Sequence, residues 1–156
     1  GRHATTELCL EWLAENELWS QNVMDYGCGS GILGIAASVM GAKSTCVDYD
    51  DQALTATSQN AEFNDLTSRN LVVEHSSTFD FELHRGCFDV VVANILARPL
   101  MDLADQLQSL LAEDGTLVLS GILENQIDVV QDSYPELSFK DPIVMDGWVR
   151  LEARQD

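Results

Sequence analysis

The stretch that most constrains this chain runs from Val23 to Leu33 and reads VMDYGCGSGIL. It begins with residues typical of a buried strand, passes through three glycines spaced by two, and continues as an apolar helix. Glycine suits a turn in which φ is positive, or in which a ligand approaches the backbone too closely for a Cβ atom. The stretch therefore predicts a strand, a turn and a helix that together hold a nucleotide-like cofactor.

The rest of the chain alternates strands and helices, which is typical of an α/β domain with a parallel sheet and helices on both faces. Strands are expected at 21–26, 44–47, 70–74, 87–93 and 116–120, and helices at 5–16, 30–40, 52–64, 99–111 and 124–133. The last part differs, because the extended runs 138–144 and 148–153 flank Asp146-Gly147. Asp-Gly between two such runs is a strong hairpin signal, so we expect the sheet to end with an antiparallel element.

A dinucleotide is one cofactor that fits this turn. The glycines in Gly29-x-Gly31-x-x-Gly34 satisfy the dinucleotide fingerprint. Asp48 ends the second expected strand, where a carboxylate can accept hydrogen bonds from both ribose hydroxyls. A nicotinamide-dependent oxidoreductase is therefore one hypothesis, although no Tyr/Lys or His/Asp pair suggests a site for hydride transfer.

S-adenosylmethionine is the cofactor that the residues favour. Asp25 precedes Gly27 and Gly29 in the pattern Asp-x-Gly-x-Gly-x-Gly. A carboxylate at this position can face the amino group of the methionine moiety, whereas it would repel a pyrophosphate. The expected hairpin also matches the antiparallel edge strand typical of adenosylmethionine-dependent methyltransferases.

Asn94 is the candidate catalytic residue. It follows the apolar run 90–92 and is expected at the carboxyl edge of the sheet, where ligands of open α/β sheets bind. Its side-chain amide can accept a hydrogen bond from a substrate amine and can also donate one to a cofactor carboxylate. The alternative is that Asn94 caps the helix around Pro99, just as Thr5 or Thr6 can cap the first helix.

Composition excludes several classes of function. The chain carries 26 acidic and 8 basic residues, a net charge of −18, which argues against direct nucleic-acid binding. The acidic surface is interpreted either as adaptation to salt or as a means of steering a basic protein substrate. The four cysteines and three histidines show no metal-ligand spacing, so no metal site is expected. Without an apolar run long enough for a bilayer or a signal peptide, we expect a cytoplasmic protein.

Longer blocks of the sequence resemble the PrmA family, the lysine methyltransferases of ribosomal protein L11. The matching blocks are Gly1-x-His3-x-Thr5-Thr6-x-Leu8-Cys9-Leu10-x-Trp12-Leu13, Asp25-Tyr26-Gly27-Cys28-Gly29-Ser30-Gly31-Ile32-Leu33, Asp48-x-Asp50-x-Gln52-Ala53-Leu54, Val91-Val92-Ala93-Asn94-Ile95-Leu96-Ala97-x-Pro99-Leu100 and Leu119-Ser120-Gly121-Ile122-Leu123. They span nearly the whole chain in the order of the family. The glycine block is shared by many methyltransferases, whereas the last two blocks are far more specific.

The resemblance implies a class I S-adenosylmethionine-dependent methyltransferase fold, which is Rossmann-like, with a seven-stranded sheet. The implied strand order is 3-2-1-4-5-7-6, with strand 7 antiparallel. The resemblance also implies that Thr6, Gly27, Asp48 and Asn94 contact the cofactor. The implied product is an N-methylated lysine or α-amine on a basic protein of the large ribosomal subunit.

The family has Phe-Gly-Thr before the position of Gly1, and ahead of that a separate small domain that docks the ribosomal protein. Neither is present in this sequence. We therefore expect residues 1–156 to form a single catalytic domain without the docking domain. A noncatalytic cofactor-binding module is the remaining alternative, and the sequence leaves the oligomeric state open.

Overall fold

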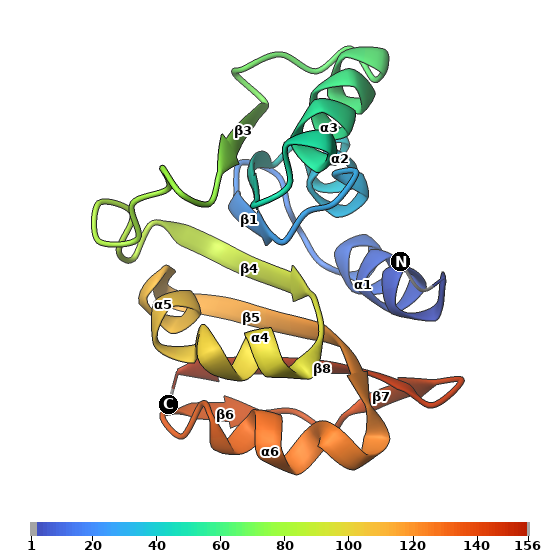
Figure 1. The fold of residues 1–156 in the computed structure, drawn as a ribbon, viewed down its shortest axis with the longest axis vertical. Coiled ribbons are helices and arrows are strands. Elements are labelled where there is room, and N and C mark those ends of the chain that lie inside the picture. The colour runs from blue at the N-terminus through green and yellow to red at the C-terminus, as the bar shows by residue number, and fades with distance from the viewer. Residues whose placement is uncertain (1–2, 156) are drawn as a thin grey trace.

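The computed structural model describes residues 3–155, which form one mixed sheet with helices on both faces (Figure 1). The helices are α1 (His3–Glu15), α2 (Ile32–Val39), α3 (Asp51–Phe63), α4 (Ala97–Asp102), α5 (Ala104–Ser109), the 3-10 turn η1 (Glu124–Gln126) and α6 (Ile127–Asp132). The strands are β1 (Asn22–Tyr26), β2 (Lys43–Asp48), β3 (Leu71–His75), β4 (Phe88–Asn94), β5 (Leu111–Leu123), β6 (Leu137–Phe139), β7 (Ile143–Met145) and β8 (Trp148–Gln155). None of the helices in the described part of the chain has the length and apolar character needed to cross a membrane.

The strand order is β3-β2-β1-β4-β5-β8-β6, and β7 also pairs with β8. Strands β1 to β5 pair in parallel, and β8 is antiparallel to β5, β6 and β7. The expected order is confirmed, with β8 as the antiparallel strand in the place of the expected strand 7. The expectation of seven strands is wrong, because the sheet formed by residues 3–155 has eight. The run 138–144 is divided into β6 and β7 around Pro142, which has no N–H with which to continue a ladder.

Among the differences from the expected bounds, two concern a helix and a strand that flank β4 in the chain or the sheet. The single helix expected at 99–111 is two helices, α4 and α5, which meet at Leu103. Leu103 has φ −96° and ψ 8°, although neither proline nor glycine stands there. Strand β5 begins at Leu111 rather than at Thr116, because Leu111 pairs with Phe88 before the register shifts. Asp114, where φ is 65°, therefore lies as an irregularity inside β5.

Helices α1, α2 and α3 cover one face of the sheet, and α4, α5 and α6 cover the other (Figure 1). Strand β4 shows how the sequence builds both faces. Val90 and Val92 pack in the cluster that contains residues of α1 and α2, while Val91 and Ala93 pack with α4 and α5. Alternate side chains of a strand point to opposite faces, so a strand buried on both sides reads as one continuous apolar run.

Candidate functional site

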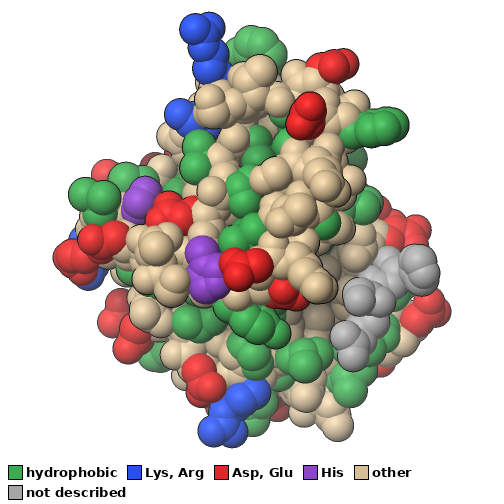
Figure 2. Space-filling view, turned by 45° about the horizontal axis from the view of Figure 1, so that its top comes forward, with side chains coloured by type: hydrophobic (Ala, Val, Ile, Leu, Met, Phe, Trp, Pro, Cys, Tyr) green, Lys and Arg blue, Asp and Glu red, His purple; other side chains and the backbone are tan. Residues whose placement is uncertain are grey.

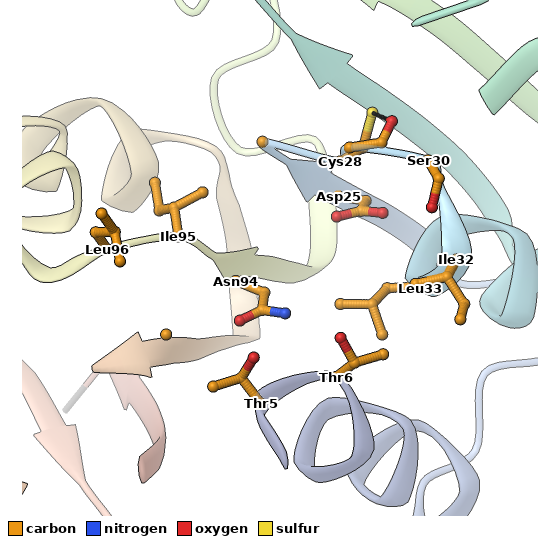
Figure 3. A pocket seen from close by; sticks show the side chains of 13 residues that line it. Thr5, Thr6, Asp25, Cys28, Ser30, Ile32, Leu33, Asn94, Ile95 and Leu96 are labelled. Atoms are coloured by element: carbon orange, nitrogen blue, oxygen red, sulfur yellow. Dashed lines mark hydrogen bonds between the residues drawn. The ribbon is translucent and has the colours of Figure 1, made fainter. Parts of the chain in front are cut away.

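A cavity of about 330 Å³ lies at the carboxyl edge of the sheet, where β1, β4 and β5 meet the first turns of α1 and α2. Figure 3 shows the side chains that border it. The lining residues are Thr5, Thr6, Asp25, Gly27, Cys28, Gly29, Ser30, Ile32, Leu33, Asn94, Ile95, Leu96 and Gly121. Five of the six residues predicted to bind a cofactor or act in catalysis are among them: Thr6, Asp25, Gly27, Gly29 and Asn94.

The glycine loop between β1 and α2 uses backbone that other residues rarely adopt. Gly27, Gly29 and Gly31 have φ values of 74°, 56° and 83°. The N–H groups of Gly27 and Cys28 both donate to the carbonyl of Val47, at 2.8 and 3.0 Å, which ties the loop to β2. A Cβ on Gly29 would meet no protein atom within 4 Å, so the loop presents bare backbone to open space.

Asp25 is a buried carboxylic acid at the end of β1. Its side chain is 2% exposed, and Oδ2 accepts a hydrogen bond from the N–H of Gly34 at 2.9 Å. Burial raises the pKa of Asp25 from 3.8 to about 7, because a charge is poorly solvated there. The hydrogen bond from Gly34 opposes this shift, and the nearby charge of Asp48 adds to it. Asp25 therefore exchanges its proton near neutral pH.

Asp48, the sixth predicted residue, does not line the cavity. Its Oδ2 accepts the N–H of Gly29 at 2.9 Å, and its Oδ1 accepts the N–H of Asp50 at 3.0 Å. The carboxylate thus holds the glycine loop from the end of β2. Because a carboxylate has about four acceptor positions, both oxygens can still accept further hydrogen bonds.

Asn94 ends β4 and pairs with Ser120 of β5. Figure 3 shows its amide pointing into the space bordered by Thr5, Thr6 and Leu33. Within residues 3–155, no hydrogen bond holds this side-chain amide. The capping interpretation is wrong, since the N-cap of α4 is Leu96.

Thr5 and Thr6 lie inside α1, which already begins at His3, so the expectation that they cap this helix is also wrong. Both line the cavity from the first turn of the helix, and Thr5 is 2% exposed. They face Asn94 across the cavity (Figure 3). The first turn of α1 therefore supplies one wall of the site.

Helix α3 supplies supports for the loop that sequence reasoning missed. The Thr57 hydroxyl donates to the carbonyl of Gly29 at 2.8 Å, and Asn60 Nδ2 donates to the carbonyl of Ser30 at 3.0 Å. A Cβ on Gly31 would lie 2.5 Å from Thr57 Cγ2, so helix and loop pack closely. The i, i+3 spacing of Thr57 and Asn60 was a signal that the two share one face of a helix.

The cysteines and histidines form no metal centre in the part of the chain that the structure describes. No group of three or more His, Cys, Asp or Glu side chains within residues 3–155 is placed to hold an ion. Cys9, Cys28 and Cys46 are buried free thiols, and Cys87 is an exposed one. Burial is the main cause that raises the pKa of Cys9 to about 12, so this thiol stays protonated.

A family model described as ribosomal protein L11 methyltransferase (PrmA) matches residues 1–156. The chain belongs to this family. The ribosomal protein L11 methyltransferase of Methylococcus capsulatus is 49% identical over 154 residues, which cover 97% of this chain and 51% of that protein. The relative from Chromohalobacter salexigens is 45% identical, covering 99% of this chain and 51% of that protein. The chain thus spans about half the length of these PrmA relatives.

Solved structures show the same fold. The ribosomal protein L11 methylase from Lactobacillus delbrueckii subsp. bulgaricus superposes with a TM-score of 0.89 at 32% identity, covering 99% of this chain and 80% of that one. Magnesium protoporphyrin IX methyltransferase from Synechocystis superposes with a TM-score of 0.74 at 20% identity, covering 97% and 78%. This PrmA chain therefore has the class I S-adenosylmethionine-dependent methyltransferase fold.

Proposed function

We propose that residues 1–156 form the catalytic domain of a PrmA enzyme that transfers a methyl group from S-adenosylmethionine to amino groups of ribosomal protein L11. The amino groups are lysine side chains or the α-amine. The observation that carries this proposal is the cavity lined together by Asn94, the glycine loop and Asp25, in which the Asn94 amide has no hydrogen bond within residues 3–155. A ribosomal-protein substrate places the activity in the cytoplasm.

The site suits a cationic cofactor. Asp25 lines the cavity, and Asp48 lies next to it, where its carboxylate accepts a hydrogen bond from the N–H of Gly29. Asp48, and Asp25 in its ionised form, attract a sulfonium and an ammonium group, whereas they would repel the pyrophosphate of a dinucleotide. The bare backbone at Gly29 leaves room for a ligand to approach. These features favour S-adenosylmethionine over a nicotinamide cofactor.

Bound S-adenosylmethionine supplies an electrophilic methyl group on a positively charged sulfur. In such a transfer, a nitrogen–carbon bond would form as the carbon–sulfur bond breaks, and the electron pair would stay on sulfur as a neutral thioether. The leaving group needs no acid, so the contribution of this chain is alignment. Asn94 accepts a hydrogen bond from the substrate amine through its carbonyl oxygen and directs the nitrogen lone pair toward the methyl group.

The amine must lose a proton before it can react, because a free lysine has a pKa of about 10.4. The apolar side chains of Ile32, Leu33 and Leu96 line the cavity, and burial of an entering amine against them would lower its pKa. The released proton passes to solvent. Asp25 and Asp48 are engaged with the backbone of the glycine loop and of its flanking elements, so neither is assigned the role of base.

Asn94→Ala tests the proposal. We expect kcat for transfer of labelled methyl to ribosomal protein L11 to fall about 10²-fold at saturating cofactor, because the amine loses its alignment. The melting temperature should stay unchanged, since the amide makes no hydrogen bond within residues 3–155. Asn64→Ala, at the exposed C-terminal end of α3, is the matched control with unchanged kcat.

Two results would count against the proposal. Unchanged methyl transfer by Asn94→Ala at saturating cofactor would show that Asn94 does not align the substrate amine. Thermal stabilisation by NAD, but not by S-adenosylmethionine or S-adenosylhomocysteine, would replace the methyltransferase with the oxidoreductase alternative.

A further inference from the structure

Ile95, which follows Asn94, lies between two glycines from distant parts of the chain. Gly27 comes from the loop after β1, and Gly121 comes from β5. A Cβ on Gly27 would overlap the Cγ2 methyl of Ile95. A Cβ on Gly121 would overlap the Ile95 carbonyl oxygen and lie 2.8 Å from its carbonyl carbon. Gly27 thus leaves room for the side chain of Ile95, and Gly121 leaves room for its carbonyl group.

Both glycines have positive φ, 74° at Gly27 and 89° at Gly121, so each position disfavours a side chain on two grounds. Gly121 also lies where the pairing of β5 with β8 shifts register, between Leu119 and Ile122. Such an irregularity changes the direction of a strand. Here it brings the α-carbon of Gly121 against the peptide of Ile95.

The turn from β4 to α4 is short, since only Ile95 and Leu96 separate Asn94 from the helix. Leu96 is the N-cap, and its carbonyl accepts the N–H of Leu100 at 3.2 Å. The Asn94 amide has no hydrogen bond within residues 3–155. Its position in the cavity is therefore set by the backbone, and that backbone is fixed by Ile95 between the two glycines.

We propose that Ile95 and Gly121 are positioning residues that hold the amide of Asn94 in register with the methyl group to be transferred. The inference rests on the proposed function for the catalytic role of Asn94. Its geometric part concerns only this chain: packing at Gly121 and Gly27 determines where the Asn94 side chain lies.

Gly121→Ala tests the backbone contact. The neighbouring atoms are a carbonyl group, which cannot rotate away as a side chain can, so the turn 94–96 must move. A misplacement of about 1 Å can lower a rate about 10²-fold, and we expect a loss of kcat of this order with little change in the Kd for S-adenosylmethionine. The side-chain amide resonances of Asn94 in a ¹⁵N-correlated NMR spectrum should shift.

Gly147→Ala is the matched control. Gly147 also has positive φ, 80°, but a Cβ there would meet nothing within 4 Å. This variant carries the conformational strain of an alanine at positive φ without the contact to Ile95. We expect its kcat and its Asn94 resonances to equal those of the wild type.

Ile95→Ala and Ile95→Val test the side-chain contact, and they decide the question if Gly121→Ala does not fold. Valine keeps a methyl group against Gly27, whereas alanine removes it. Ile95→Ala should lower kcat about 10-fold or more and shift the Asn94 resonances, and Ile95→Val should restore both. Asn94 resonances and kcat that stay unchanged in folded Gly121→Ala, or in Ile95→Ala, would overturn the inference.

Failure of the proposed function gives a different result. A wild-type chain that binds S-adenosylmethionine but methylates no amine of ribosomal protein L11 would contradict the proposed function. The Asn94 resonances would still show, in the same variants, whether Gly121 and Ile95 position the amide.

Discussion

Two features of the Asp25 environment act on its carboxyl group in opposite directions. It lies at the end of a buried strand and is 2% exposed, so its charged form is poorly solvated. Its carboxylate nevertheless accepts the N–H of Gly34, which fixes the start of α2 against β1. A pKa raised to about 7 means that the folded protein holds the Asp25 proton more tightly than the unfolded chain does. A cationic ligand would favour the ionised form again.

Asp25→Asn should change how stability depends on pH. Asparagine removes the titration and keeps an oxygen for the Gly34 N–H. Because the pKa rises from 3.8 in the unfolded chain to about 7 in the folded protein, wild-type stability is greatest below the lower value and falls through the higher one. Relative to Asp25→Asn, the wild type should lose roughly a few kcal/mol of unfolding free energy between about pH 4 and about pH 7. Urea unfolding over this range measures the difference, and a constant difference contradicts the expectation.

Single residues of the site could be predicted where residue type and local spacing are enough to indicate a binding role. The spacing of the glycines and the position of Asn94 after an apolar strand place these residues at the carboxyl edge, and the cavity is there. The packing of Ile95 between Gly27 and Gly121 was not predictable, because it joins three segments far apart in the chain. The hydrogen bond from Gly29 to Asp48 depends on loop geometry that a pattern does not contain.

At the scale of elements, α3 acts as a support for the glycine loop. Thr57 is fully buried, and its hydroxyl donates to Gly29 while its methyl group packs against Gly31. Asn60, one turn further along, holds Ser30. The loop is thus held by side chains of α3 and by Asp48 of β2, in addition to its own backbone hydrogen bonds.

Thr57→Val should weaken both the fold and cofactor binding. Valine keeps the shape of threonine but removes the hydroxyl that donates to the Gly29 carbonyl, which costs about 1 kcal/mol of unfolding free energy. Because Gly29 lines the cavity, the Kd for S-adenosylmethionine should also rise, as calorimetric titration would show. Thr55→Val, on an exposed position of the same helix, is the matched control and should change neither quantity. Unaltered affinity in Thr57→Val would mean that α3 does not control the loop.

The elements themselves follow from the sequence where side chains alternate or repeat clearly. The parallel strands read as short apolar runs, and Asp146-Gly147 marks the hairpin that β7 and β8 form. The predicted bounds of the elements were wrong where contacts between distant segments determine where a strand begins or ends. Strand β5 extends back to Leu111 because Phe88 pairs with it, and Pro142 divides the last run because it cannot continue a ladder. No residue pattern marks the break at Leu103.

Charge is the dominant property of the whole molecule. The chain has 26 acidic residues against 8 basic ones. Within residues 3–155, three carboxylates pair with Lys or Arg: Glu82, Asp102 and Glu152. Figure 2 shows acidic side chains spread over one face with few basic ones among them. The like charges on such a surface repel one another and attract basic proteins, and salt weakens both effects.

The acidic surface is interpreted either as adaptation to salt or as a means of steering a basic protein substrate. These two interpretations predict different responses of catalysis to salt. Raising NaCl from about 0.1 to about 1 M shortens the screening length from about 10 to about 3 Å, so the melting temperature should rise as self-repulsion falls. If the surface steers a basic substrate, kcat/KM for ribosomal protein L11 should fall over the same range, because encounter slows. A short lysine peptide without net charge is the control, and its kcat/KM should not fall. A kcat/KM for the ribosomal protein that rises together with the melting temperature would contradict steering and assign the acidic surface to salt adaptation.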